Sequence, residues 1–328
     1  MAIIIGEKDS SKLLPIAIMA YNEEKVIQKA VESVLDQRTP IGYSVKAVVV
    51  ANGCVDRTEE IVKSLVRQHS NKVVLLSIKE KGKTRAINRA ISYFDELSKN
   101  DLLIPYVIFL DADCEFKGEE ALINFVNRFE QNSQLCAVGA DCLPDVVFNT
   151  RKDMVAEIYR VTYELSKSVR INSISGGCYG IRSDILNRMD FPNFQLAEDM
   201  YVSSRLNGWF YRDRKIKIIF KTPSNLRGEI SRRKRVEINT RRYHEYYSHL
   251  KRKGLRVSLF EKSLSDDYRW WGATDNHIIK VWFRLKGIKP KFFVMAYALI
   301  TLWAKIKASR TLTKMKKNED LDYWKVSR

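Results

Sequence analysis

The first half of the chain alternates apolar, β-branched runs with amphipathic segments, and this alternation restricts the fold more than any other feature. Strand-like runs lie at 13–20, 45–51, 72–78 and 104–110, and segments with apolar residues at helical spacing separate them. Strands and helices that alternate at this spacing predict parallel strands joined by right-handed crossovers. We therefore expect an α/β fold with a mainly parallel sheet flanked by helices.

Polar residues follow these strands, where an open α/β sheet binds its ligands. The strand ends carry Asn22-Glu23, Asn52-Gly53, the lysine-rich segment 79–83, and Asp111 with Asp113. Two carboxylates separated by one residue at a strand end can hold Mg²⁺ or Mn²⁺, together with substrate phosphates. A simple turn after the strand is the alternative interpretation of this pair.

Two further groups of charged residues add to this pattern. Glu198 and Asp199 open a helical segment, where they can stabilise the helix dipole or supply a general base. Lys83 and Arg85 stand at the start of another helical segment and form a basic group suited to phosphate. The glycine pattern of a P-loop is absent from this second segment.

Six short motifs occur in one order between about residues 14 and 206 and resemble glycosyltransferase family 2. This family has the GT-A fold, a Rossmann-like sheet flanked by helices, and its members are inverting enzymes with nucleotide-sugar donors. The motifs are PIAIMAYNEE, VVVANGCVDRT, KEKGKTRAINRAI, YVIFLDADC, SGGCYGIRSD and LAEDMYVSSRL.

The resemblance implies donor-binding roles for the matching residues. Asn22 and Glu23 fall on the loop that lines the nucleotide, and Lys83 and Arg85 match the basic stretch near the donor phosphates. Asn52 lies where the family usually has an Asp that contacts the base. Here it follows an alanine, whereas many members have a pair of acids, so the resemblance does not identify the base.

The resemblance also implies a metal and a catalytic base. Asp111 and Asp113 match the family's D-x-D motif, which implies Mn²⁺ or Mg²⁺ with Asp113 as the direct ligand. Asp199 matches the aspartate of the E-D motif, the base that deprotonates the acceptor hydroxyl, and Glu198 is its neighbour. Processive members carry Q-x-x-R-W downstream. This chain has RRKRV there, which keeps only Arg235 for phosphate contact and predicts non-processive transfer.

Charge divides the chain into two unequal parts. Residues 212–328 hold 31 Lys and Arg against 11 Asp and Glu, whereas the whole chain has 57 against 39. We expect a catalytic domain at 1–225 and a basic, mainly helical region at 226–328 that contacts the acceptor or a membrane. The basic excess predicts an anionic membrane surface as a partner, in preference to nucleic acid, because no nucleic-acid-binding motif is present.

Apolar and aromatic residues in this basic region agree with a membrane contact. The run 292–304 is 13 residues long, too short to span a bilayer, and suits a core helix or an interfacial anchor. Aromatic residues interleaved with Lys and Arg suit the headgroup layer, although they also suit a protein core. They are Tyr268, Trp270, Trp271, Trp282, Phe283, Trp303 and Trp324.

The cysteines and the N-terminus indicate an intracellular protein. The chain has five cysteines and no C-x-x-C pair, which favours a reducing compartment over a disulfide framework. No signal peptide is evident, so we expect a cytoplasmic protein, peripheral on the inner face of the membrane. Two other functions remain open: a catalytically silent binding module for nucleic acid or anionic polymer, supported by Ala51-Asn52, and a nucleotidyltransferase, which shares the strand-end metal chemistry.

Overall fold

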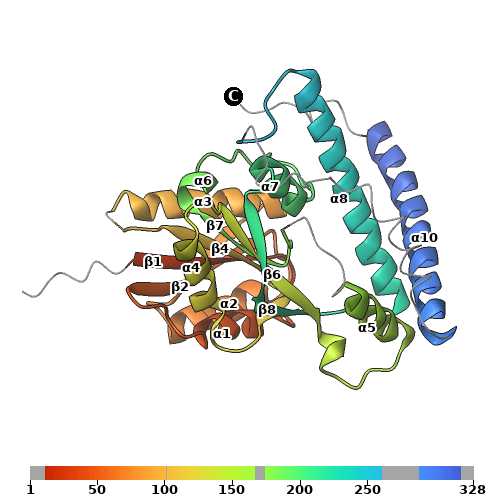
Figure 1. Ribbon diagram of the computed structural model, residues 1–328, viewed down its shortest axis with the longest axis horizontal. Helices are drawn as coiled ribbons and strands as arrows, with labels where there is room; N and C mark the ends of the chain where they lie inside the picture. The colour runs from red at the N-terminus through yellow and green to blue at the C-terminus, as the bar shows by residue number, and fades with distance from the viewer. Residues whose placement is uncertain (1–11, 101, 167–173, 261–287, 319–328) are drawn as a thin grey trace, which may run out of the picture.

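A twisted eight-stranded sheet forms the centre of the molecule, with helices on both of its faces (Figure 1). The computed structural model describes residues 12–100, 102–166, 174–260 and 288–318. The strands follow the order β3-β2-β1-β4-β7-β6-β8-β5 across the sheet. Their bounds are β1 (Lys12–Ala20), β2 (Tyr43–Asn52), β3 (Val73–Ile78), β4 (Tyr106–Asp111), β5 (Cys114–Phe116), β6 (Ala137–Pro144), β7 (Cys178–Arg182) and β8 (Phe210–Phe220).

The helices divide between the two faces of the sheet and the side of the molecule. Core residues of α3, α6, α7 and α8 pack on one face, and those of α1, α2 and α4 pack on the other. Their bounds are α1 (Ile27–Leu35), α2 (Thr58–Gln68), α3 (Lys83–Ser98), α4 (Ala121–Gln131), α5 (Met154–Ser166), α6 (Ser183–Leu186), α7 (Glu198–Leu206), α8 (Leu226–Arg252) and α10 (Ile288–Asn318).

The parallel half of the sheet confirms the expected α/β arrangement. β1 pairs in parallel with β2 and β4, and β2 pairs in parallel with β3. The register sets Met19 opposite Asp111 and Ala20 opposite Ala51, so these strands end together. The polar residues that follow them are therefore brought to one edge of the sheet.

The other half of the sheet is mixed and was not fully predicted. β7 pairs antiparallel with both β4 and β6, and β8 pairs parallel with β6. The basic stretch 210–220, which has no clear strand pattern in the sequence, forms β8. A register shift between Ala140 and Asp141 interrupts the β6–β8 pairing. Asp213 is buried there and paired with Arg128, so the strand lacks a continuous apolar alternation.

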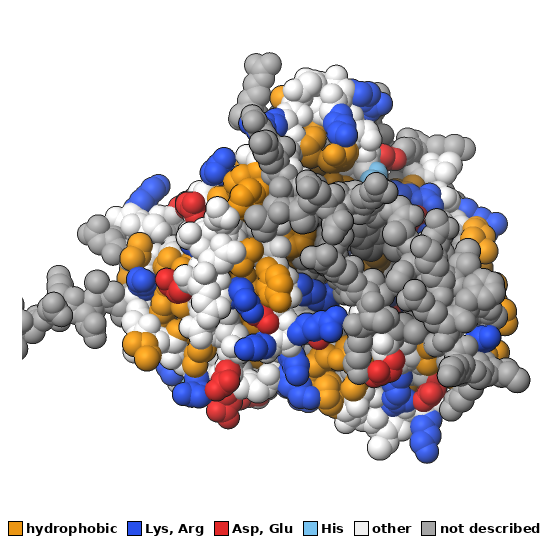
Figure 2. All heavy atoms as spheres, viewed as in Figure 1, with side chains coloured by type: hydrophobic (Ala, Val, Ile, Leu, Met, Phe, Trp, Pro, Cys, Tyr) orange, Lys and Arg blue, Asp and Glu red, His pale blue; other side chains and the backbone are white. Residues whose placement is uncertain are grey.

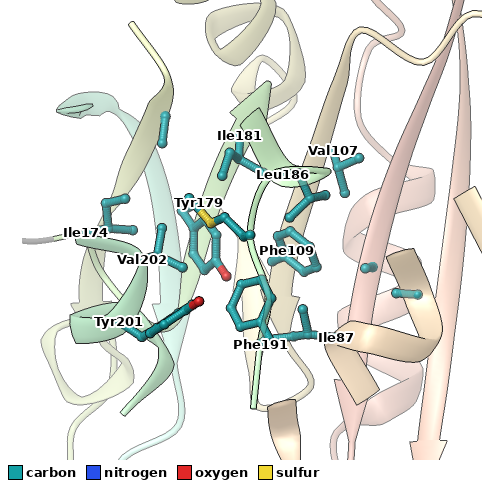
Figure 3. Close-up of a cluster of buried hydrophobic side chains, with 14 of the residues drawn as sticks. Ile87, Val107, Phe109, Ile174, Tyr179, Ile181, Leu186, Phe191, Tyr201 and Val202 are labelled. Carbon is teal, nitrogen blue, oxygen red and sulfur yellow. The ribbon is translucent and has the colours of Figure 1, made fainter. Parts of the chain in front are cut away.

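Alternation along β1 divides its side chains between the two cores. Leu13, Ala17 and Met19 face the core shared with α3 and α7, and Leu14, Ile16, Ile18 and Ala20 face the core shared with α1. Figure 3 shows part of the first core, where Phe109, Tyr179 and Phe191 lie close together. Tyr201 of α7 packs on Phe191 with a ring separation of 5.2 Å, which fixes α7 beside the sheet.

Helix α10 is longer than the 13-residue apolar run from which a helix too short to span a bilayer was expected. Residues 292–304 belong to the 31-residue helix α10, which is about 46 Å long at 1.5 Å per residue and exceeds a hydrocarbon core. Within the described residues, one helix, at Lys291–Thr313, has the length and composition to cross a membrane. The aromatic residues at 268–283 and Trp324 lie outside the described residues.

Candidate active site

The buried ammonium group of Lys83 is the centre of the candidate site. Its Nζ lies 2.5 Å from Asp111 Oδ1, is ion-paired with Glu198 and donates a hydrogen bond to the carbonyl of Gly176 at 3.0 Å. The strand-end aspartate of β4 and the first residue of α7 are thus joined through one cation. Since these two acids are 87 positions apart, only the fold brings them together.

Local backbone geometry explains why Lys83 points into this site. Gly82 precedes α3 with φ of +138°, a conformation that side-chain-bearing residues rarely adopt. Its amide donates to Asn52 Oδ1 at 3.1 Å, and Asn52 Nδ2 donates to the carbonyl of Ala20 at 2.8 Å. Asn52 therefore connects the ends of β1 and β2 to the start of α3.

In this structure Asn52 bonds to the backbone on both sides, and the expected base contact stays a prediction. The side chain is 4% exposed, and both ends of its amide are bonded to the backbone. Such an amide positions the loop that carries Lys83.

Burial and neighbouring charges alter the pKa values of Asp111 and Lys83. Burial raises the pKa of Asp111 to about 7; Lys83 opposes this rise, while the Asp113 and Glu198 carboxylates add to it. Burial would lower the pKa of Lys83, but Asp111 and Glu198 hold its pKa well above the usual value. The lysine therefore remains charged and neutralises part of an acidic cluster.

Asp199 lies beside this cluster at the first turn of α7. Its Oδ1 accepts a hydrogen bond from its neighbour's backbone amide, Met200 N, at 2.9 Å. Burial and the Glu198 carboxylate raise the pKa of Asp199 to about 6, while Lys83 opposes the rise. A carboxylate with this pKa is mostly ionised at neutral pH and binds a proton more readily than an ordinary aspartate does.

Gly176 is a functional position that sequence reasoning did not single out. Its carbonyl accepts from Lys83, and a Cβ at this residue would lie 3.4 Å from both Asp199 Oδ2 and Glu198 Oε1. Gly176 therefore lies in close contact with the carboxyl groups of both acids. The glycine pair at 176–177 is visible in the sequence, although its contact with residues on α7 is not.

A second acidic group faces the first from the loop after β1. Burial raises the pKa of Glu23 to about 7, and the Asp113 carboxylate adds to the rise, whereas Arg235 of α8 opposes it. Glu23 N donates to Thr58 Oγ1 at 2.8 Å, which anchors this loop to α2. Asp113 and Arg235 therefore both lie within electrostatic range of Glu23, so the structure brings Arg235 to the site.

Two of the predicted donor residues have mainly local contacts. Asn22 is exposed at φ of +56°, and its Oδ1 accepts from Val55 N at 2.9 Å. Arg85 donates to the carbonyls of Asn193 at 2.9 Å and Lys81 at 3.4 Å. Both side chains bond to backbone groups of neighbouring loops, and their expected donor contacts stay predictions.

The donor set at the strand end fits a divalent cation. Among the described residues no group of three or more His, Cys, Asp or Glu has the arrangement of a metal site, so a cation here would rely on Asp111, Asp113 and substrate phosphates. One or two carboxylates are the usual protein ligands of Mg²⁺ at such sites. The raised pKa values of Asp111 and Glu23 reflect an acidic cluster that a further cation would stabilise.

Comparison with known families adds independent information. The sequence pattern of Glycosyl transferase family 2 matches residues 16–189, more than half of the 328-residue chain. The match includes Asp111 and Asp113 and ends before Glu198 and Asp199.

Comparison with individual proteins identifies a curated relative and a solved structure. Minor teichoic acid biosynthesis protein GgaA of Bacillus subtilis (strain 168) is 28% identical over 104 residues, which are 32% of this chain and 22% of that protein. The mannosyltransferase PcManGT from Pyrobaculum calidifontis, solved with GDP-Man and Mn²⁺, is 17% identical with a TM-score of 0.52. That likeness covers 94% of this chain and 76% of the other, and it shows a shared fold.

Proposed function

The chain belongs to glycosyl transferase family 2 and has the GT-A fold, and we propose that it catalyses inverting, non-processive sugar transfer. The donor is a nucleotide-sugar and the acceptor is a hydroxyl group. The observation that carries the proposal is the contact of Lys83 with both Asp111 and Glu198. This contact joins the strand-end acids, suited to a diphosphate–metal complex, to Asp199, suited to proton abstraction.

The donor side of the proposed reaction needs charge stabilisation for a diphosphate leaving group. We assign Asp111 and Asp113 to a Mn²⁺ or Mg²⁺ ion, which when bound supplies Lewis-acid stabilisation of that group. The structure of PcManGT in complex with GDP-Man and Mn²⁺ supports this assignment by analogy. Arg235, within electrostatic range of Glu23, is available for a donor phosphate.

The acceptor side needs a base that removes one proton. Asp199 takes the proton from the acceptor hydroxyl as its oxygen attacks the anomeric carbon, and the bond to the diphosphate breaks. One such displacement inverts the anomeric configuration. Burial supports the role of Asp199, because its pKa of about 6 combines ionisation at neutral pH with raised proton affinity.

Lys83 acts through other residues in this proposal. Its ammonium is held by two carboxylates and a carbonyl, so it positions Asp111 and Glu198 and is not free for the donor phosphates expected from the sequence. The alternative function, a catalytically silent binding module, was supported by Ala51-Asn52, which stands where many family members have a pair of acids. Both residues are buried and Asn52 has a positioning role, so this substitution leaves the acidic cluster intact.

We also propose a role for each part of the chain and a location for the reaction. Residues 1–225 supply donor binding and catalysis, and residues 226–328 contact the acceptor or the cytoplasmic face of a membrane. The basic excess of residues 212–328 supports this division. The name of the GgaA relative makes teichoic-acid-type polymers the first acceptors to test.

A donor screen tests the proposed function. Nucleotide-sugars are measured for thermal stabilisation of the protein and for slow hydrolysis, each with and without Mn²⁺. We expect one donor class to raise the melting temperature only when the metal is present and to be hydrolysed. If no nucleotide-sugar is bound or hydrolysed under either condition, the proposal is wrong.

A further inference from the structure

The outward face of α10 is an apolar surface that the proposed active site does not use. Each of its six large apolar side chains exposes between 43 and 60% of its surface. They recur at spacings of three and four residues and therefore form one stripe along the helix. The α10 stripe consists of Phe292, Met295, Leu299, Leu302, Trp303 and Ile306.

The opposite face of α10 is packed against the protein. Val294, Ile300, Ala304 and Ala308 are buried. The helix thus has two apolar faces, of which, among the described residues, one is covered and the other is exposed. A contiguous exposed apolar surface of this kind marks a site of interaction.

Side-chain bonds fix α10 to α8. Arg233 of α8 donates to Thr301 Oγ1 at 2.8 Å, and Arg241 donates to Ser309 Oγ at 2.6 Å. The second bond lies eight residues further along the chain than the first in both helices. The two helices therefore run parallel, as Figure 1 shows. The stripe is therefore held in a fixed orientation on the outside of the molecule.

The charged residues of α10 that flank the stripe are all basic. Between Lys291 and Thr313 the sequence contains four Lys or Arg and no Asp or Glu. Lys307 Nζ lies 3.8 Å from the centre of the Trp303 ring, beside the stripe. Figure 2 shows hydrophobic and basic side chains together along the edge of the molecule formed by α10.

We infer that the α10 stripe binds an anionic phospholipid surface, with α10 lying in the interface between headgroups and acyl chains. An apolar face bordered by Lys and Arg is the pattern of an interfacial helix, which combines burial of apolar area with attraction to anionic lipid. This inference rests on the proposed membrane location and adds the surface and its orientation.

The attachment to α8 opposes a spanning arrangement of α10. The helix is long enough to cross a bilayer, but only by leaving α8 or by taking α8 into the hydrocarbon. Leaving would expose the buried face and break the Arg233 and Arg241 bonds. Taking α8 along would bury many of its nine Lys and Arg residues, each at a cost of ~2.5 kcal/mol or more.

Charge also favours lipid over a second copy of the chain. The spacing of the stripe suits helix pairing, but two copies would bring Lys305 and Arg310 against like charges, with no acidic residue between Lys291 and Thr313 to pair with them. Anionic headgroups supply the opposite charge along the whole helix.

Vesicle co-sedimentation of the full chain tests the inference. The stripe variant Leu299→Gln/Leu302→Gln is compared with the control Ile41→Gln/Leu103→Gln, which changes two exposed apolar residues far from α10 in the sequence. The vesicles contain phosphatidylglycerol and phosphatidylcholine. We expect the vesicle affinity of the stripe variant to fall by ~10-fold at least, and the affinity of the control to equal that of wild type. Circular dichroism verifies that all three proteins are folded.

Other outcomes overturn the inference. Equal binding by stripe variant and wild type, or no binding of wild type to anionic vesicles, excludes the stripe as a lipid surface. A wild-type dimer that the stripe substitutions dissociate, with vesicle binding unchanged, identifies a second copy as the occupant. Retention of wild type on vesicles after alkaline carbonate extraction indicates that α10 spans the bilayer.

Nucleotide-sugar binding by the same proteins separates this inference from the proposed function. If wild type binds anionic vesicles through the stripe but binds no nucleotide-sugar, the proposed function fails and the lipid surface stands. If it binds nucleotide-sugar but ignores vesicles, the lipid surface fails and the proposed function stands.

Discussion

At the scale of single residues, Lys83 determines how the charges of the site are arranged. Its ammonium contacts carboxylates from β4 and α7 and so connects two acids of the site. Asp113 and Arg235 instead act electrostatically on Glu23, on the other side of the site. Residue-scale experiments can therefore separate metal binding from proton abstraction.

Asp199→Asn keeps the shape of the side chain and removes its ability to accept a proton. We expect the transfer rate to fall ~10²-fold or more, the usual contribution of a positioned general base, with donor affinity unchanged. Steady-state kinetics and donor titration measure the two quantities. A parallel loss of donor affinity would move Asp199 from catalysis to binding.

The pH dependence of the wild-type enzyme provides a second test of Asp199. Only the ionised carboxylate accepts a proton, and its pKa is raised from 3.8 to about 6. The value of kcat/KM should therefore rise with pH up to about 6 and fall approximately tenfold for each unit below it. The residual rate of Asp199→Asn should lack this acidic limb, and an unchanged limb in that variant would assign it to another group.

Asp113→Ala removes one of the two proposed metal ligands. We expect the variant to lose Mn²⁺-dependent thermal stabilisation by a nucleoside diphosphate while it stays folded. Glu119→Ala, at an exposed acid in the following loop, is the matched control and should retain that stabilisation. If Asp113→Ala binds the metal–nucleotide pair as well as the control does, the metal assignment is wrong.

At the scale of elements, a buried ion pair holds α8 beside α5 and α10. Glu229 of α8 is fully buried; it is ion-paired with Arg233 and accepts from Tyr159 Oη of α5 at 2.8 Å. Arg233 also lies 4.0 Å from the centre of the Tyr297 ring of α10. One charged pair thus contacts three helices.

Arg233→Met should be strongly destabilising, because it leaves the Glu229 carboxylate buried without its cation. We expect a loss of ~3–5 kcal/mol in the free energy of unfolding, measured by urea denaturation. The double variant Arg233→Met/Glu229→Gln should recover part of this loss. Arg241→Met breaks a more exposed pair of the same i,i+4 spacing, with Glu237, and should cost ~1 kcal/mol or less.

At the scale of the whole molecule, α8 completes the core of the sheet domain. Tyr243, Tyr246 and Leu250 of α8 are buried in the cluster that also contains Tyr201 of α7. The division at residue 225 therefore separates proposed functions, and the two parts share one hydrophobic core.

A chain ending at residue 225 should consequently fail to reach the native packing. Each of the three buried α8 side chains contributes ~1.5–3 kcal/mol, so their loss approaches the ~5–15 kcal/mol stability of an ordinary domain. We expect weak near-ultraviolet circular dichroism and binding of a hydrophobic dye. A cooperative unfolding transition similar to that of the full chain would show that the truncated part folds independently.

The sequence by itself determined the parallel half of the fold and most of the candidate residues. β-branched runs and helical spacing are local signals, and they predicted β1 to β4 and α1 to α3 because the parallel strands are buried along nearly their whole length. Motif order identified the acids at 111, 113, 198 and 199. The roles of Asp113 and Asp199 stay predictions.

Only the tertiary structure decided which charges meet. The pairing of Lys83 with Asp111 and Glu198, the burial of Asn52 and the approach of Arg235 to Glu23 depend on segments that are tens to hundreds of positions apart. The same is true of β8 and of α10, whose exposed stripe is defined by the helix that covers its other face. Long-range packing sets burial, and burial together with neighbouring charge sets the pKa of each acid, so local patterns alone do not carry this information.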